Sequence, residues 1–163
     1  MKPKHVHTCE AMNKLIEDDD ELLEFLEDKP KWYEIDNKQN NDNSEVLNYL
    51  YEPNSMILKS GAFGLICDRH DVKKLNSNSH LYTSKKLIDF PGRAFKVESV
   101  VNYSKRNLKD LNISKANITT RNFPMDVKDI RKKSKILDGG KDYLFFTTNH
   151  VDKQIIIKTK KTH

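Results

Sequence analysis

From Phe90 to the C-terminus the chain alternates strand and helix patterns, and their order constrains the fold most. Ala94 to Tyr103 alternates apolar and polar residues as a strand does, and Ser104 caps a short helical stretch from Lys105 to Leu111. A strand, a helix and two strands follow at residues 116–121, 125–135, 143–148 and 154–159. This β-α-β-α-β-β order predicts an α+β sandwich with helices packed on one side of a sheet.

The stretch from Asn122 to Phe146 combines a dense run of basic side chains with helix and strand signals. Pro124 is expected in the first helical turn, and the Gly139-Gly140 pair is expected to end the helix in a tight turn. An apolar strand follows at once. The helix carries five basic side chains in eight residues: Lys128, Arg131, Lys132, Lys133 and Lys135.

Charge is distributed unevenly along the chain, although the net charge of the whole is only +5. Residues 1–52 contain 6 Lys and Arg against 14 Asp and Glu, whereas residues 53–163 contain 23 against 10. Residues 92–163 alone have a net charge of +10. Either the acidic part folds against the basic part, or the basic part has a polyanionic partner.

Two units are expected before the β-α-β-α-β-β unit, which we place at residues 91–163. Residues 1–46 are predicted to hold an acidic amphipathic helix, a short strand and a polar linker. Residues 47–90 are predicted to hold a helix with Pro53 in its first turn, running to about His70, and a short strand near Tyr82. Gly61 and Gly64 inside that helix suggest close packing against another backbone.

No group of residues forms a recognisable catalytic or metal-binding motif, so we predict no catalytic, cofactor-binding or metal-ligating residue. Histidines, carboxylates and thiols are present but scattered: Cys9, Cys67, His80, Asp138, Asp142 and His150. The segment from Asp138 to Asp142 fits either a nest of backbone N–H groups for an anion or a plain helix stop, which we favour. The chain has no apolar run of membrane-spanning length and no signal-peptide pattern, which predicts a cytoplasmic protein.

A nucleic-acid interface accounts for the basic residues better than an active site does. Contact with phosphates needs only clustered cations, and each neutralised phosphate adds affinity by releasing counterions. A solvated helix face explains the same residues without a partner, and both interpretations stay open. The predicted contact residues are the five on the helix together with Arg93 and Arg121.

Five blocks of the sequence, taken together and in order, are similar to the C-terminal part of a group of bacterial class I S-adenosylmethionine-dependent methyltransferases. In that group a ferredoxin-like domain and then a THUMP-like domain follow the methyltransferase domain. The blocks are Tyr51–Phe63, Leu75–Ser84, Phe90–Phe95, Ile130–Lys133 and Asp138–Leu144.

The resemblance implies a ferredoxin-like remnant followed by a THUMP-like domain, a kind of domain associated with RNA binding in RNA-modifying enzymes. It implies S-adenosylmethionine as the cofactor of the full-length family, but the family's methyltransferase domain and glycine-rich loop have no counterpart among the 5 glycines here. We therefore expect a noncatalytic module, from a truncated or split gene or an accessory protein, that recognises structured RNA. The alternatives are a subunit that docks onto a separately encoded methyltransferase, and a small intact methyltransferase.

Overall fold

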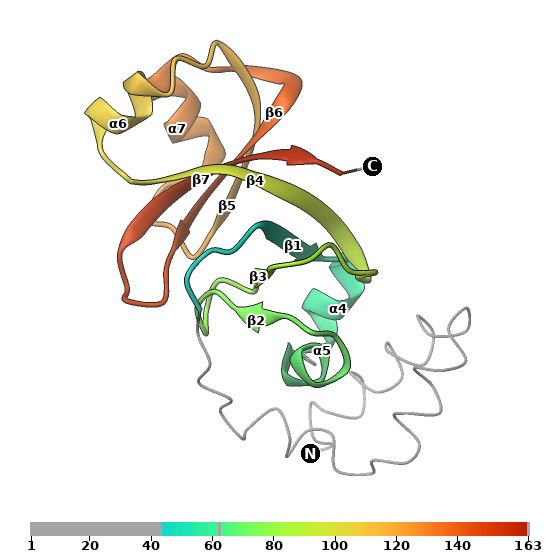
Figure 1. Cartoon of the computed structure of the whole chain (residues 1–163). Coiled ribbons are helices and arrows are strands. Elements are labelled where there is room, and N and C mark those ends of the chain that lie inside the picture. Colours follow the sequence, from blue (N-terminus) through green and yellow to red (C-terminus); the bar gives the residue numbers. More distant parts are fainter. Residues whose placement is uncertain (1–43, 62, 163) are drawn as a thin grey trace.

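The computed structural model describes residues 44–61 and 63–162 (Figure 1). The acidic helix, the strand and most of the linker expected in residues 1–46 lie outside the described residues. The strands are β1 (Tyr49–Pro53), β2 (Lys73–Lys74), β3 (Tyr82–Ser84), β4 (Gly92–Asn102), β5 (Lys115–Arg121), β6 (Leu137–Thr148) and β7 (Gln154–Lys161). The helices are α4 (Ser55–Ser60), α5 (Phe63–Arg69), α6 (Lys105–Asp110) and α7 (Val127–Ser134).

The strands of the described residues form one seven-stranded sheet in the order β2-β3-β1-β4-β7-β6-β5. The long strand β4 joins its two halves, because it pairs antiparallel with β1 on one edge and with β7 on the other. Phe95, for example, lies opposite Leu50 of β1 and opposite Lys161 of β7. At one end of the sheet β5 runs parallel to β6, and α7 provides the crossover that parallel strands need.

Alternating side chains place apolar residues on both faces of the sheet. On β6, Phe146 joins a cluster with Leu108 of α6 and Ile130 of α7, whereas the adjacent Phe145 joins a second cluster with Leu50 of β1. A third cluster lies between β1, β3 and the helices α4 and α5. The two helix pairs therefore cover opposite ends of the molecule, with the sheet between them (Figure 1).

The predicted α+β class and the β-α-β-α-β-β order are confirmed by β4, α6, β5, α7, β6 and β7. Both helices of this unit pack on the same side, against one cluster. The Ser104 hydroxyl caps α6 by accepting a hydrogen bond from the Asn107 backbone N–H at 2.9 Å. None of the helices in the described ranges is long and apolar enough to cross a membrane.

The helix expected from Pro53 to about His70 is wrong in its start and its continuity. Pro53 is the last residue of β1, and the Asn54 side chain caps α4 by accepting from the backbone N–H groups of Met56 and Ile57. Gly61, with φ +73°, ends α4 before α5 begins. A Cβ at Gly61 would meet open space, so this glycine serves the left-handed helix end and not close packing.

The ends of the basic helix also differ from the prediction. α7 begins at Val127, so Pro124 precedes the helix instead of lying in its first turn, and Asp126 caps the helix by accepting from the backbone N–H of Asp129 at 2.8 Å. Lys135 ends the helix in the left-handed conformation, with φ 60°. The Gly139-Gly140 pair lies inside β6 instead of stopping the helix. Because a lysine occupies this position instead of the usual glycine, the sequence pattern did not predict where the helix ends.

The glycine at the start of β4 lies very close to the backbone of β1. A Cβ on Gly92 would lie 2.1 Å from the Glu52 carbonyl oxygen and 2.9 Å from the Pro53 Cα. Both are backbone atoms of β1 and have little freedom to move away. The pairing of β1 with β4 therefore requires glycine at this position.

We expect the Gly92→Ala substitution to lower the free energy of unfolding by at least about 2 kcal/mol, because the strands must separate to admit the methyl group. Urea unfolding followed by circular dichroism measures the change. The Lys96→Ala variant, at an exposed position of the same strand, serves as the control and is expected to stay within about 0.5 kcal/mol of the wild type. An unchanged unfolding midpoint for the glycine variant would contradict the close approach.

Candidate nucleic-acid interface

The basic side chains of α7 do not share one environment. Ile130 is buried, at 1% exposure, and fixes the inner face of the helix against the sheet. Lys128, Lys132, Lys133 and Lys135 are exposed, and the Lys133 ammonium contacts the Met125 sulfur at 3.0 Å. Three of these lysines lie at the C-terminal end of the helix, where they also offset its partial negative charge.

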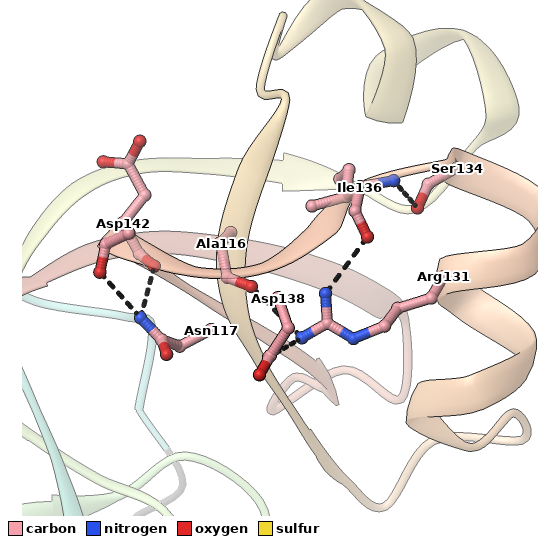
Figure 2. A network of polar contacts seen from close by, with 8 residues as sticks. Ala116, Asn117, Arg131, Ser134, Ile136, Asp138 and Asp142 are labelled. Carbon is pink, nitrogen blue, oxygen red and sulfur yellow. Dashed lines mark hydrogen bonds and ion pairs between the residues drawn. The ribbon is translucent and has the colours of Figure 1, made fainter.

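Arg131 lies between these lysines in sequence but points into the fold (Figure 2). Its guanidinium donates to the carbonyl oxygens of Ile136 and Ala116, at 3.1 Å each, and to the Asp138 carboxylate at 2.5 Å. Only 22% of its side chain is exposed. The arginine therefore joins the end of α7 to the starts of β5 and β6, and few of its donors remain for a partner.

The Gly139-Gly140 pair forms part of a wide bulge in β6. Ala116 of β5 lies opposite Asp138, whereas the next residue, Asn117, lies opposite Tyr143, so residues 139–142 are extra on β6. Both glycines have positive φ, 92° and 87°. The Asn117 amide donates to the carbonyl oxygens of Gly140 at 3.0 Å and Asp142 at 3.3 Å (Figure 2). The segment is thus a bulge closed by an asparagine, and the preferred helix-stop interpretation is wrong.

Arg93 and Arg121, the other two predicted contact residues, meet at Glu52. One carboxylate oxygen of Glu52 accepts from the Arg93 Nε at 2.7 Å and also from its Nη2, and the other accepts from the Arg121 Nη2 at 2.7 Å. The Glu52 side chain is only 6% exposed, against 45% for Arg93 and 32% for Arg121. These arginines balance a buried carboxylate, so fewer of their donors are available to a partner.

Sequence reasoning missed Glu52 as the partner of these arginines. A single acidic residue among the apolar residues of the β1 sequence YLYEP was the available signal, since a buried carboxylate needs a cationic partner. Its two arginines lie 41 and 69 residues further along the chain. Only the paired strands bring the three side chains together.

Glu98 neutralises part of the basic C-terminal strand. Its carboxylate accepts from Lys160 at 2.9 Å and lies 3.3 Å from the Lys158 ammonium. The hydrogen bond from Lys160 lowers the pKa of Glu98 below its ordinary value of 4.5, against a smaller opposing effect of burial and with further help from Lys158. The same contact raises the pKa of Lys160. These two lysines are less available to an anionic partner than those of α7.

The other reactive side chains of the described residues stay apart. His80 stacks on Phe63 with ring centroids 3.9 Å apart, Asp138 pairs with Arg131, and His150 lies in the turn after β6. In the described ranges no group of three or more His, Cys, Asp and Glu side chains is placed to hold a metal ion. Cys9 lies outside the described residues, so the structure does not give the distance between its thiol and that of Cys67.

We expect Arg131→Ala to lower the free energy of unfolding by about 2 kcal/mol, because three hydrogen bonds that join α7 to the sheet are lost. The neighbouring Lys132→Ala substitution is the matched control and should change it by less than about 0.5 kcal/mol. Urea unfolding of both variants tests this difference. Equal stability of the two variants would show that Arg131 is an ordinary surface cation.

The Glu98 contacts predict a pH dependence. Because the folded-state pKa is lowered, the stabilisation is complete above the unfolded carboxyl value and disappears as the pH falls through the folded value. Glu98→Gln should therefore be less stable than the wild type at pH 7, and the two should converge at pH values well below 4.5. Thermal unfolding over this range measures it, with Glu98→Gln in a Lys158→Met, Lys160→Met background as control. A difference that is independent of pH would contradict the ionic origin.

Comparison with known proteins agrees with this architecture. Residues 49–91 match a family described as a ferredoxin-like domain, and residues 92–161 match a family described as THUMP domain-like. The crystal structure of a putative methyltransferase from Porphyromonas gingivalis W83 is similar, with a TM-score of 0.70 and 37% sequence identity. The match covers 74% of this chain and 31% of that chain. Curated proteins gave no match.

The two matched regions meet at Gly92, where β4 starts and packs closely on β1. The first region contains α4, α5 and the strands β1 to β3, and the second contains the β-α-β-α-β-β unit with the lysine-bearing helix. The resemblance of the five sequence blocks is thereby confirmed. The chain contains a ferredoxin-like domain at residues 49–91 followed by a THUMP-like domain at residues 92–161, and it is similar to part of a putative methyltransferase.

Proposed function

We propose that this chain is a noncatalytic substrate-recognition module of an S-adenosylmethionine-dependent methyltransferase, and that it binds structured RNA. The observation that carries the proposal is the group of exposed lysines on α7 of a THUMP-like domain: Lys128, Lys132, Lys133 and Lys135. THUMP-like domains are often RNA-binding. A cytoplasmic location, and the division into units at residues 1–46, 47–90 and 91–163, belong to the same proposal.

The proposal assigns different tasks to lysines and arginines. Exposed lysines meet phosphates as point charges, whereas Arg131, Arg93 and Arg121 use their planar, multidentate guanidinium groups in hydrogen bonds to other parts of the chain. Arg131 then contributes to RNA binding mainly by holding α7 against the sheet, and Arg93 and Arg121 by fixing the junction at Glu52. This division follows from the exposed fractions and the hydrogen-bond partners of the individual side chains.

The glycines favour a module without its own cofactor site. A class I methyltransferase needs a glycine-rich loop after a strand, where the backbone can approach the cofactor. Here Gly61 ends α4, Gly64 lies in α5, Gly92 starts β4, and Gly139 and Gly140 form the β6 bulge. The residues present do not fit S-adenosylmethionine, so in this proposal the cofactor belongs to a separate catalytic domain or subunit.

Binding of the full chain to a structured RNA, measured at two salt concentrations, tests the proposal. We expect Lys132→Glu with Lys133→Glu to weaken binding about tenfold or more at low salt, because phosphate contacts and the associated counterion release are lost. Lys85→Glu with Lys86→Glu makes the same charge change at exposed positions of the ferredoxin-like domain and is the matched control. Absence of binding at low salt, or equal effects of the two double variants, would refute the proposal.

A second candidate function is a protein-interaction subunit that docks onto a separately encoded methyltransferase. It is favoured by the uneven charge of the chain, since residues 1–52 carry 6 Lys and Arg against 14 Asp and Glu whereas residues 53–163 carry 23 against 10. Affinity purification of the full chain at low salt is expected to recover a partner with a methyltransferase domain. Recovery of RNA without such a partner would count against docking and leave the RNA-binding proposal in place.

A further inference from the structure

A groove of about 880 Å³ lies between α6 and α7 and concentrates positive charge from two segments of the chain. Lys105 and Lys109 line it from α6, and Lys133 and Lys135 line it from the end of α7. None of the residues that line the groove is Asp or Glu. The contact residues predicted from the sequence did not include the two α6 lysines, although their four-residue spacing on one helix face was a signal.

The charges of the groove lack carboxylate partners among the described residues. The acidic residue of α6, Asp110, pairs with Arg106 at 3.7 Å. Arg106 does not line the groove. No ion pair between described residues includes any of the four groove lysines. The four lysines, including Lys133 whose ammonium contacts the Met125 sulfur, thus line one hollow that has no acidic side chain, and this excess of positive charge favours an anion there.

The other groove residues suit a sugar-phosphate backbone better than a base. Tyr103 supplies the aromatic side chain, but its ring packs edge-on against Phe123 and Phe146, with centroids 5.1 Å and 6.2 Å away. It is held in the core cluster and is poorly placed for base stacking. Asn112 and Ser114 add an amide and a hydroxyl at the groove. Ammonium, amide and hydroxyl groups bind phosphates and 2′-hydroxyls, whereas base recognition in single strands uses exposed aromatic faces.

We propose that the α6–α7 groove binds the sugar-phosphate backbone of RNA, with phosphates held between the α6 and α7 lysines and without recognition of base identity. This inference rests on the proposed RNA-binding function and gives it a place and a mode of recognition. The exposed Lys128 and Lys132, which do not line the groove, are auxiliary contacts. Binding through the groove is therefore salt-dependent and indifferent to sequence.

The test compares three charge-reversed double variants of the full chain: Lys105→Glu with Lys109→Glu, Lys128→Glu with Lys132→Glu, and Lys85→Glu with Lys86→Glu. Affinity is measured over a series of salt concentrations for two structured RNAs of the same shape and different sequence. We expect the groove variant to reduce the slope of log affinity against log salt by about 2, one unit for each lysine, and to do so equally for both RNAs. The control at Lys85 and Lys86 should keep the wild-type slope. Lys105→Gln with Lys109→Gln, with the fold checked by circular dichroism, repeats the test with a milder change.

Each outcome bears on a separate claim. If the groove variant keeps the wild-type slope while the Lys128, Lys132 variant loses it, the groove assignment is overturned and RNA binding by α7 stands. If the wild type binds neither RNA at low salt, both the groove and the proposed function fail. A loss confined to one RNA sequence would overturn recognition without bases. Binding of an acidic peptide that depends on Lys105 and Lys109, when RNA binding does not, would assign the groove to a protein partner and overturn the proposal.

Discussion

The first strand of the THUMP-like domain, β4, joins the two domains by pairing with both. β4 pairs with β1 of the ferredoxin-like domain along one edge and with β7 of the THUMP-like domain along the other. Glu52 reinforces this junction, because its buried carboxylate accepts hydrogen bonds from Arg93 on β4 and from Arg121 at the end of β5. A buried carboxylate is costly without such partners. The contacts of Glu52 with the two arginines therefore stabilise one arrangement of the domains. The position of the lysine-bearing helices relative to the first domain follows from this junction.

Local signals were sufficient for the order of elements in the THUMP-like domain. Alternating residues in β4, the Ser104 cap and the apolar β6 and β7 strands each act over a few neighbouring residues, and the structure contains all of them. Features that depend on distant partners were not predictable. The bulge at Gly139 and Gly140 exists because Asn117 of another strand completes its hydrogen bonds, and a local pattern gives no sign of that contact.

In the candidate site, too, the sequence did not predict which charged side chains make contacts within the fold. The sequence correctly indicated a dense group of cations around α7, but it could not distinguish Arg131 from the adjacent Lys132. Three acceptors, on β5, on β6 and at Ile136 just before β6, hold Arg131, whereas Lys132 is exposed. The groove arises only when α6 and α7 pack side by side and bring Lys105 and Lys109 toward Lys133 and Lys135. Side-chain environment, more than charge density, therefore decides which residues of a basic region are available to a partner.

We propose that exposed lysines on α6 and α7 contact RNA, while Arg93 and Arg121 hold the two domains together through Glu52. Titration of the ¹⁵N-labelled full chain with a structured RNA at low salt, followed by amide chemical shifts, tests it residue by residue. The predicted result is a group of shifted amides at Lys105, Lys109 and the end of α7, with the amides of Glu52, Arg93 and Arg121 unchanged. Shifts centred on Arg93 and Arg121, or no shifts at any RNA concentration, would contradict the claim.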